Sequence, residues 1–123
     1  MVLRFAYLAA AIAAALLTGA ADAADSISRF RMKPDPRNES ECHGLDDNMA
    51  LEHIITVNGN DAEIASRGGI VGRMVPVRRN VFRLAFELEG KRVDAMVDFA
   101  AQPVRLVVTE RERSCRWSAT PEK

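Results

Sequence analysis

The feature that most constrains the fold is a pair of alternating segments joined by a glycine turn. Residues 82–88 carry an apolar side chain at every second position, and residues 93–99 repeat the pattern after Glu89-Gly90-Lys91. Successive side chains of a β-strand point to opposite faces of the sheet, so each segment has one face to bury. Two such segments around a glycine-containing turn predict a β-hairpin with one apolar face.

Shorter β signals lie on both sides of this hairpin. A β-branched run at 52–57 ends at Asn58-Gly59, a strong hairpin turn signal, and residues 62–66 return from that turn. Pro76 has no backbone N–H to donate to the hydrogen bonds between strands, so we expect its strand to be an edge strand or to carry a bulge. Further strands are expected at 70–77, at 104–111, at 112–117 as a bulged continuation of the latter, and at 28–32 as a short edge strand.

These signals predict an all-β protein. We expect a small antiparallel meander of about five to seven strands that closes into a partial barrel or a sandwich, because one sheet must curl or pair to bury its apolar face. Residues 24–44 are polar and interrupted by prolines, so they are expected to form an N-terminal arm ahead of an antiparallel β domain at 45–123. A short helical turn is expected at 45–51, capped by Asp46 or Asp47.

Residues 1–23 have the organisation of a signal peptide for export. One arginine precedes an unbroken apolar run at 5–17, and Ala21-Asp22-Ala23 places small residues where signal peptidase cleaves. The run is shorter than the roughly 20 residues that span a bilayer, and no basic cluster follows it. We therefore expect a signal helix that is removed on export by cleavage after Ala23 or Ala20. The mature chain is then expected in the bacterial periplasm or secreted, without a permanent membrane anchor.

The two cysteines of the chain, Cys42 and Cys115, predict one disulfide, because export brings the chain into an oxidising compartment. Closing a loop of this length should destabilise the unfolded chain by roughly 4 kcal/mol. One alternative is a metal site that adds His43 and His53, although the spacing matches no zinc template. The other alternative is a reactive thiol at Cys115, which lies among arginines. Trp117 is expected to pack against the disulfide.

The chain offers few residues for catalysis. Lys and Arg number 17 and Asp and Glu also number 17, so the basic excess typical of a general nucleic-acid binder is absent. Only two histidines are present, and no P-loop, dinucleotide fingerprint, nucleophile elbow or zinc-protease motif occurs. We therefore predict a protein that is not an enzyme, has no cofactor and no metal site, and binds no nucleic acid.

Four arginines lie close together in an irregular segment that contains glycine and proline: Arg73, Arg78, Arg79 and Arg83. Their density predicts a patch that binds an anion or a partner, because guanidinium groups form paired hydrogen bonds with carboxylates and phosphates. The alternative is that these charges keep an exposed strand edge from pairing with another chain. Farther along, the alternating charges of 110–113 predict cross-strand ion pairs rather than a site.

Three hypotheses for function follow from these patterns. The first is a non-enzymatic binding module of the bacterial cell envelope that recognises an envelope or extracellular protein or an anionic polymer. The second is a periplasmic inhibitor of a lysozyme or protease, by analogy of architecture alone. The third is a carrier of a small apolar ligand in the mouth of the barrel, although a barrel of this size is barely wide enough for its own side chains.

Overall fold

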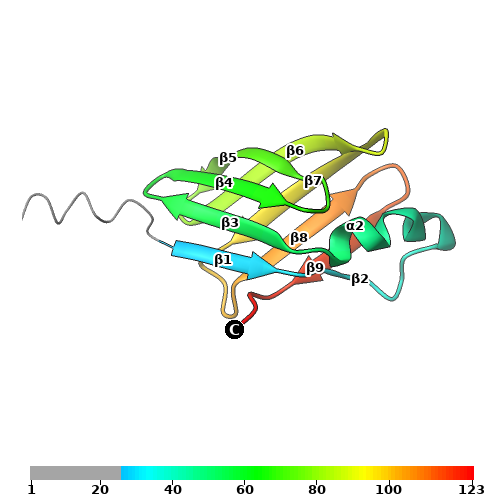
Figure 1. Cartoon of the computed structure of the whole chain (residues 1–123), viewed down its shortest axis with the longest axis horizontal. Coiled ribbons are helices and arrows are strands. Elements are labelled where there is room, and N and C mark those ends of the chain that lie inside the picture. Colours follow the sequence, from blue (N-terminus) through cyan, green and yellow to red (C-terminus); the bar gives the residue numbers. More distant parts are fainter. Residues whose placement is uncertain (1–25) are drawn as a thin grey trace, which may run out of the picture.

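The computed structural model describes residues 26–123, which fold into one curled antiparallel sheet (Figure 1). The predicted signal peptide at 1–23 lies outside the described residues. Nine strands are found in the described part, and they form a half-barrel in the order β1-β3-β4-β5-β6-β7-β8-β9-β2. The all-β prediction is confirmed, with more strands than the expected five to seven.

The elements follow one another along the chain without a repeated unit. The strands are β1 (Ser26–Phe30), β2 (Lys33–Pro34), β3 (His53–Asn58), β4 (Asp61–Ser66), β5 (Val71–Arg78), β6 (Val81–Leu88), β7 (Lys91–Asp98), β8 (Arg105–Glu110) and β9 (Cys115–Ala119). Between β2 and β3 lie a 3-10 helix, η1 (Ser40–Leu45), and a short α-helix, α2 (Asp46–Ala50). The predicted hairpin of alternating segments corresponds to β6 and β7, which pair over their whole length.

The polar arm joins the two edges of the sheet and contributes two strands where one was expected. β1 pairs with β3 at one edge, and β2 follows β1 closely but pairs with β9 at the other edge. The backbone N–H of Glu122 donates to the carbonyl oxygen of Arg29 at 2.7 Å, so the tail after β9 also returns to β1. Because one continuous segment serves both edges, the meander from β3 to β9 curls into a half-barrel.

Residues 112–117 do not continue β8 as a bulged strand, so that prediction is wrong. β8 ends at Glu110, a turn follows, and β9 returns antiparallel to β8. The buried carboxylate of Glu110 accepts hydrogen bonds from the backbone N–H groups of Glu112 and Arg113, both at 3.0 Å, and so satisfies two donors of the turn. Arg113 pairs with Glu41 at 3.1 Å, so the alternating charges do not form the expected cross-strand ion pairs.

Strand β5 changes partner along its length. Its first half, residues 71–74, pairs with β4, and its second half pairs with β6, with a shift of register between Pro76 and Arg78. This irregularity matches the bulge expected from Pro76. Leu84 of β6 packs over Gly72, where an added Cβ would lie 3.2 Å from Leu84 Cδ2. The absence of a side chain at Gly72 therefore lets β6 lie close to β5 where their ladder ends.

The concave side of the sheet holds the hydrophobic core. Side chains on alternate positions of β7 and β8 are buried there, while their neighbours point outward, as the period of two predicts. The largest buried apolar side chains come from strands, helices and connecting segments, and they include Phe30, Met32, Leu45, Met49, Ile55, Ile64, Leu106 and Trp117. The core therefore fills the half-barrel with side chains from both ends of the described chain.

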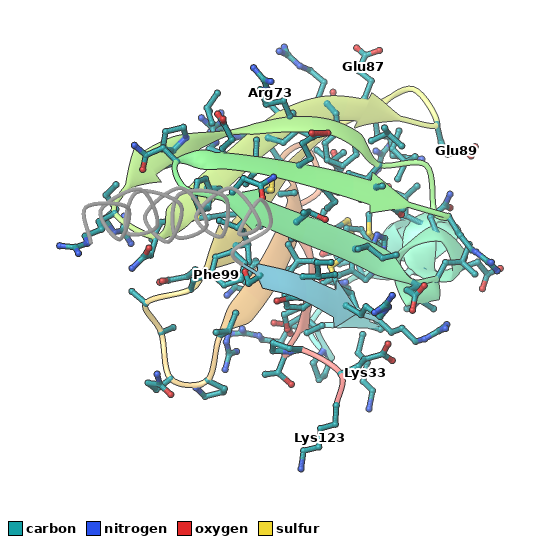
Figure 2. The ribbon with its side chains drawn as sticks, turned by 60° about the vertical axis from the view of Figure 1, so that its left-hand side comes forward. Lys33, Arg73, Glu87, Glu89, Phe99 and Lys123 are labelled. Carbon is teal, nitrogen blue, oxygen red and sulfur yellow. A yellow bond between two sulfur atoms is a disulfide. The ribbon has the colours of Figure 1, made fainter. Side chains whose placement is uncertain are left out.

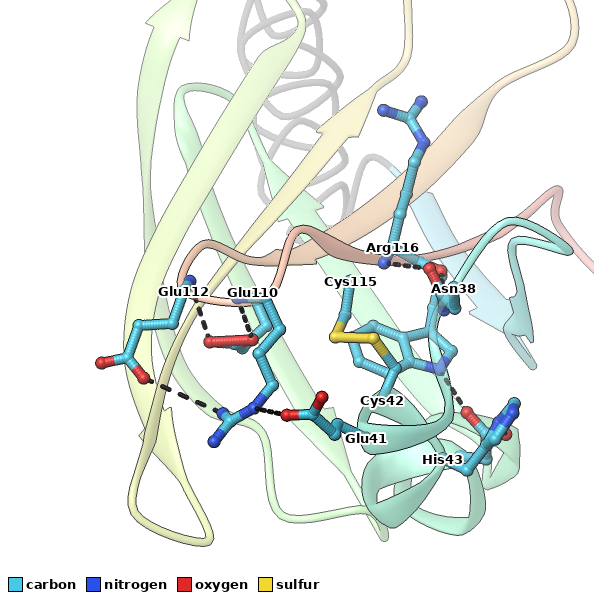
Figure 3. Close-up of a disulfide and its surroundings, with 11 residues drawn as sticks. Asn38, Glu41, Cys42, His43, Glu110, Glu112, Cys115 and Arg116 are labelled. Carbon is cyan, nitrogen blue, oxygen red and sulfur yellow. Dashed lines mark hydrogen bonds and ion pairs between the residues drawn. A yellow bond between two sulfur atoms is a disulfide. The ribbon is translucent and has the colours of Figure 1, made fainter.

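The predicted disulfide between Cys42 and Cys115 is confirmed, and it joins η1 to the start of β9 across 73 positions (Figure 3). Because the two sulfurs are bonded to each other, they are not ligands of a metal or reactive thiols in this state. Trp117 is buried in the same core cluster, and its indole N–H donates to Asp46 at 2.8 Å. The helical turn predicted at 45–51 corresponds to α2, but capping by an aspartate is wrong, because Asp46 binds Trp117 and His43 instead.

Candidate functional site

The charges of the chain are unevenly distributed between its early and late strands. Residues 71–119 contain ten Lys and Arg against six Asp and Glu, whereas residues 26–70 contain five against eight. The zero net charge of the whole chain therefore conceals an excess of positive charge on β5–β9 and their turns. A local excess of this kind attracts anions to the surface that carries it.

Arg83 and Asp94 form the best-defined ion pair of this region. Arg83 Nε donates to Asp94 Oδ1 at 2.7 Å, and Nη2 donates to Oδ2 at 2.8 Å, so the contact is bidentate. The hydrogen bonds that Arg83 donates to Asp94 hold the pKa of Arg83 above its ordinary value. Both side chains lie on the outer side of the β6–β7 hairpin, so the pair neutralises one cation of this surface.

Three of the remaining acidic side chains of β5–β9 are also engaged. Asp98 Oδ1 accepts the backbone N–H groups of the two alanines after β7, at 2.8 and 3.1 Å. Glu110 accepts the N–H groups of its turn, and Glu112 lies 3.8 Å from Arg113. Among residues 71–119, the acidic side chains without a hydrogen bond or ion pair to another described residue are Glu87 and Glu89.

The positive side chains, in contrast, are mostly unpaired. Eight of the ten make no ion pair within 4.0 Å to any residue of the described range. They are Arg73, Arg78, Arg79, Lys91, Arg92, Arg105, Arg111 and Arg116. We call the outer surface of β5–β9, with the turns that carry these side chains and Arg83, the basic face.

The four arginines predicted from the sequence all lie on the β5–β6 hairpin. Arg73 and Arg83 point outward from the two strands, on the side to which Val75, the cross-strand partner of Arg83, also points. Figure 2 shows Arg73 directed away from the sheet. Arg78 ends β5 and Arg79 begins the turn. Each half of β5 pairs on one side only, so these charges also flank an open edge, as the alternative interpretation requires.

Four further arginines of the basic face were missed by sequence reasoning: Arg92, Arg105, Arg111 and Arg116. The outward positions of Arg92, Arg105 and Arg116 on β7, β8 and β9 follow from the alternation of polar and apolar residues, and Arg111 begins the turn after β8. The register that brings them to one surface does not, because it depends on the β8–β9 turn and on which strands are neighbours. Figure 3 shows Arg116 extending away from the disulfide, toward the outside of the sheet.

The basic face is hollowed over β6–β8. Two hollows of ≈ 590 and ≈ 600 Å³ adjoin there, and we call them together the outer groove. Both are lined by Arg83, Asp94, Thr109 and Arg111. Arg92 and Glu87 line one end, and Arg116, Met96, Val107 and Val77 line the other. The groove therefore combines cations, a hydroxyl, a paired carboxylate and apolar side chains.

Apolar side chains are exposed beside these charges. Val71, Val75 and Val77 of β5 are 69, 58 and 47 % exposed, and Met96 of β7 is 37 % exposed. Exposed apolar side chains that lie together among polar ones mark binding surfaces more often than single ones do. The basic face can thus bury apolar contacts as well as pair with anions.

The two histidines lie away from the outer groove. His43 Nδ1 is 2.8 Å from Asp46 Oδ2 beside the disulfide, and His53 is buried in β3. Residues 26–123 contain no cluster of three or more His, Cys, Asp or Glu side chains suited to hold a metal.

Within the same residues, no helix has the length and hydrophobicity to cross a membrane. No protein-family model, curated protein or solved structure matches the chain.

Proposed function

We propose that the protein is an exported, non-enzymatic binding module of the bacterial cell envelope, and that its basic face binds an anionic partner. The observation that carries the proposal is the imbalance of this face, with eight unpaired cations against two unpaired acids. Unpaired arginines are ready to bind carboxylates or phosphates in a bidentate manner, with no internal ion pair to break.

Export is supported by two independent features. The sequence at 1–23 has the organisation of a signal peptide, and the Cys42–Cys115 disulfide fits an oxidising compartment. We place the mature protein in the periplasm or outside the cell on these grounds. Binding on the outer surface is favoured over transport of an apolar ligand, because both hollows of the outer groove lie on the convex side and the concave side is filled by core residues.

The proposal is tested by capture of partners from a native envelope extract. The double variant Arg111→Glu/Arg116→Glu reverses two exposed charges of the basic face. Its matched control is Arg67→Glu/Lys123→Glu, which changes net charge equally at exposed positions outside that face (Lys123 is labelled in Figure 2). We expect the wild type and the control to retain the same anionic protein or polymer, and the basic-face variant to lose it. Equal retention by all three proteins would show that the basic face is not the binding surface.

A further inference from the structure

We propose that two copies of the protein pair through an open edge of β6, residues 84–88, as antiparallel strands related by a two-fold axis. The two sheets then join into one. This inference goes beyond the proposed function, because it concerns the edge of one strand and not the basic face. It comes from the backbone that is left unpaired where β5 leaves β6 and from the side chains along that edge.

The edge exists because β5 changes partner. β6 pairs with β7 over its whole length, but with β5 only as far as Arg83. Residues 84–88 therefore have β7 on one side and no described strand on the other. The first half of β5 instead crosses the inward side of β6, where an added Cβ at Gly72 would lie 3.2 Å from Leu84 Cδ2. Figure 1 shows the β6–β7 hairpin continuing past the turn that follows β4.

The side chains along this edge are accessible. Ala85 and Glu87 point outward and are exposed. Phe86 points to the opposite side of the sheet and is half-buried, yet it lines the same hollow of the outer groove as Ala85 and Glu87. The hollow therefore extends to the edge of β6. Figure 2 shows Glu87 and Glu89 directed away from the body of the sheet.

The sequence along the open edge does not protect it from pairing. Proteins usually block exposed strand edges with proline, lysine or a bulge. The open part of β5, residues 75–78, has such protection, since it contains Pro76, a shift of register and Arg78. Residues 84–88 contain no proline, glycine or lysine, keep an unbroken register with β7, and carry one charge, Glu87. This edge is thus suited to accept a further strand.

The pattern of side chains favours a second copy as the added strand. In an antiparallel pair, directly opposite residues point to the same side, so the apolar sides of two sheets stay together only in certain registers. One such register places Phe86 opposite Phe86 of the other copy. Leu84 then lies opposite Leu88, and Ala85 lies opposite Glu87. All five open residues find a partner, and the half-buried aromatic rings meet at the centre of the pair.

The charges along the edge select the same register. Glu87 and Glu89 are the two acidic side chains of β5–β9 without a partner in one copy. In the pair, Glu87 faces the small side chain of Ala85 and lies diagonally beside Arg83 of the other copy. The contact of Arg83 with Asp94 uses Nε and Nη2, which leaves Nη1 for a second carboxylate.

The neighbouring registers are less favourable. A shift by two residues in one direction places Glu87 opposite Glu87, and like charges directly opposite each other are destabilising. A shift in the other direction requires Phe82 and Arg83, whose outer edge β5 already occupies. The register centred on Phe86 is therefore the one that we expect.

The inference is tested by sedimentation equilibrium of the mature, oxidised protein from micromolar to millimolar concentration. We expect a monomer–dimer equilibrium with a Kd in the micromolar range, because a pair of short strands is smaller than a standard interface. Ala85→Glu places like charges opposite each other at two symmetric positions, so it should raise the Kd about tenfold or more. Ala85→Glu/Glu87→Lys places opposite charges at both positions and should restore the dimer.

Ala65→Glu is the matched control. It makes the same substitution at an exposed outward position of β4, a strand that is paired on both sides, and it should dimerise like the wild type. The basic-face variant Arg111→Glu/Arg116→Glu should also dimerise, so a failure of envelope capture and a failure of dimerisation are distinguishable.

Hydrogen–deuterium exchange gives a second measurement that needs no variant. The amides of 84–88 that face the open edge should exchange more slowly at millimolar than at micromolar concentration, and those of 75–78 should not change. Three results would each overturn the inference: a wild type that stays monomeric at millimolar concentration, a dimer that Ala85→Glu and Ala65→Glu leave equally strong, or no concentration-dependent protection at 84–88.

Discussion

The indole N–H of Trp117 donates to Asp46 Oδ1 at 2.8 Å, and this hydrogen bond joins residues 71 positions apart. Asp46 lies at the start of α2 and Trp117 in β9, two residues after the disulfide cysteine of that strand. The second carboxylate oxygen, Oδ2, lies 2.8 Å from His43 Nδ1. The helical connection between β2 and β3 is thus held against β9 by the Cys42–Cys115 disulfide and by the neighbouring Trp117–Asp46 hydrogen bond.

Replacement of Asp46 by Ala should destabilise the protein by about 1–3 kcal/mol, because it leaves the N–H of the fully buried Trp117 side chain without its acceptor. The measurement is the urea midpoint of the oxidised protein, followed by tryptophan fluorescence. Asp47→Ala is the matched control, since Asp47 is the neighbouring exposed carboxylate of the same helix. A midpoint equal to that of the control would contradict a stabilising role for the Trp117–Asp46 contact.

Loss of the disulfide should lower the unfolding free energy by about 4 kcal/mol, because Cys42 and Cys115 close a long loop in the unfolded chain. The double variant Cys42→Ala/Cys115→Ala and the reduced wild type should show the same decrease in a denaturant titration. This is a large part of the stability of a domain of this size. Identical midpoints for the oxidised and reduced wild type would show that the cross-link contributes nothing to stability.

The sequence predicted the elements of the fold better than their connections. Alternation identified β6 and β7, and the turn signal after β3 identified the β3–β4 hairpin, because both signals are local. The sequence could not predict that the N-terminal arm also supplies a strand at the other edge of the sheet. This strand, β2, has two residues, and its pairing with β9 depends on the curl of the whole sheet. The end of β8 was missed for a similar reason. Glu110 stands at an inward position of β8, and the sequence does not show that its buried carboxylate accepts the N–H groups of the following turn.

The candidate site was predictable in kind but not in extent. Four arginines close together in the sequence indicated Arg73, Arg78, Arg79 and Arg83. The larger part of the basic face comes from three later strands and the turn after β8, whose arginines are far apart in the sequence. Counting charges along the chain also could not show that Asp94 neutralises Arg83 while Arg111 and Arg116 stay unpaired, because this depends on which side chains lie opposite each other.

A methyl group at Gly68 should disrupt the contact between α2 and the β4–β5 turn. A Cβ at this position would collide with the backbone carbonyl of Asn48, whose side-chain amide donates to the carbonyl oxygen of Gly68 at 3.0 Å. Because the obstacle is backbone, we expect Gly68→Ala to cost about 1–3 kcal/mol of unfolding free energy. Gly44→Ala is the control, since a Cβ at Gly44 meets no atom within 4 Å, and its change should stay within about 0.5 kcal/mol. Equal thermal midpoints for the two variants would contradict the predicted collision.

Stability should fall when the pH drops below the ordinary pKa of histidine, because His53 is fully buried in the core. Its Nε2–H donates to the carbonyl oxygen of Met49 at 2.9 Å, and its Nδ1 has no hydrogen-bond partner among residues 26–123. Burial lowers the pKa of His53 from 6.5, and the charge of Arg31 acts in the same direction, against the hydrogen bond to Met49. The unfolded chain therefore binds the proton more tightly, so this contribution is complete above about pH 6.5 and is lost as the pH falls toward the lowered value.

His53→Gln, which keeps a donor for Met49, should flatten the unfolding free energy between about pH 6.5 and pH 5. Asp35 does not interfere, since its pKa is lowered to about 2 by the hydrogen bonds from Arg37, and its contribution is lost only in more acidic solution. An unchanged slope in the His53→Gln variant would assign the pH dependence to another group.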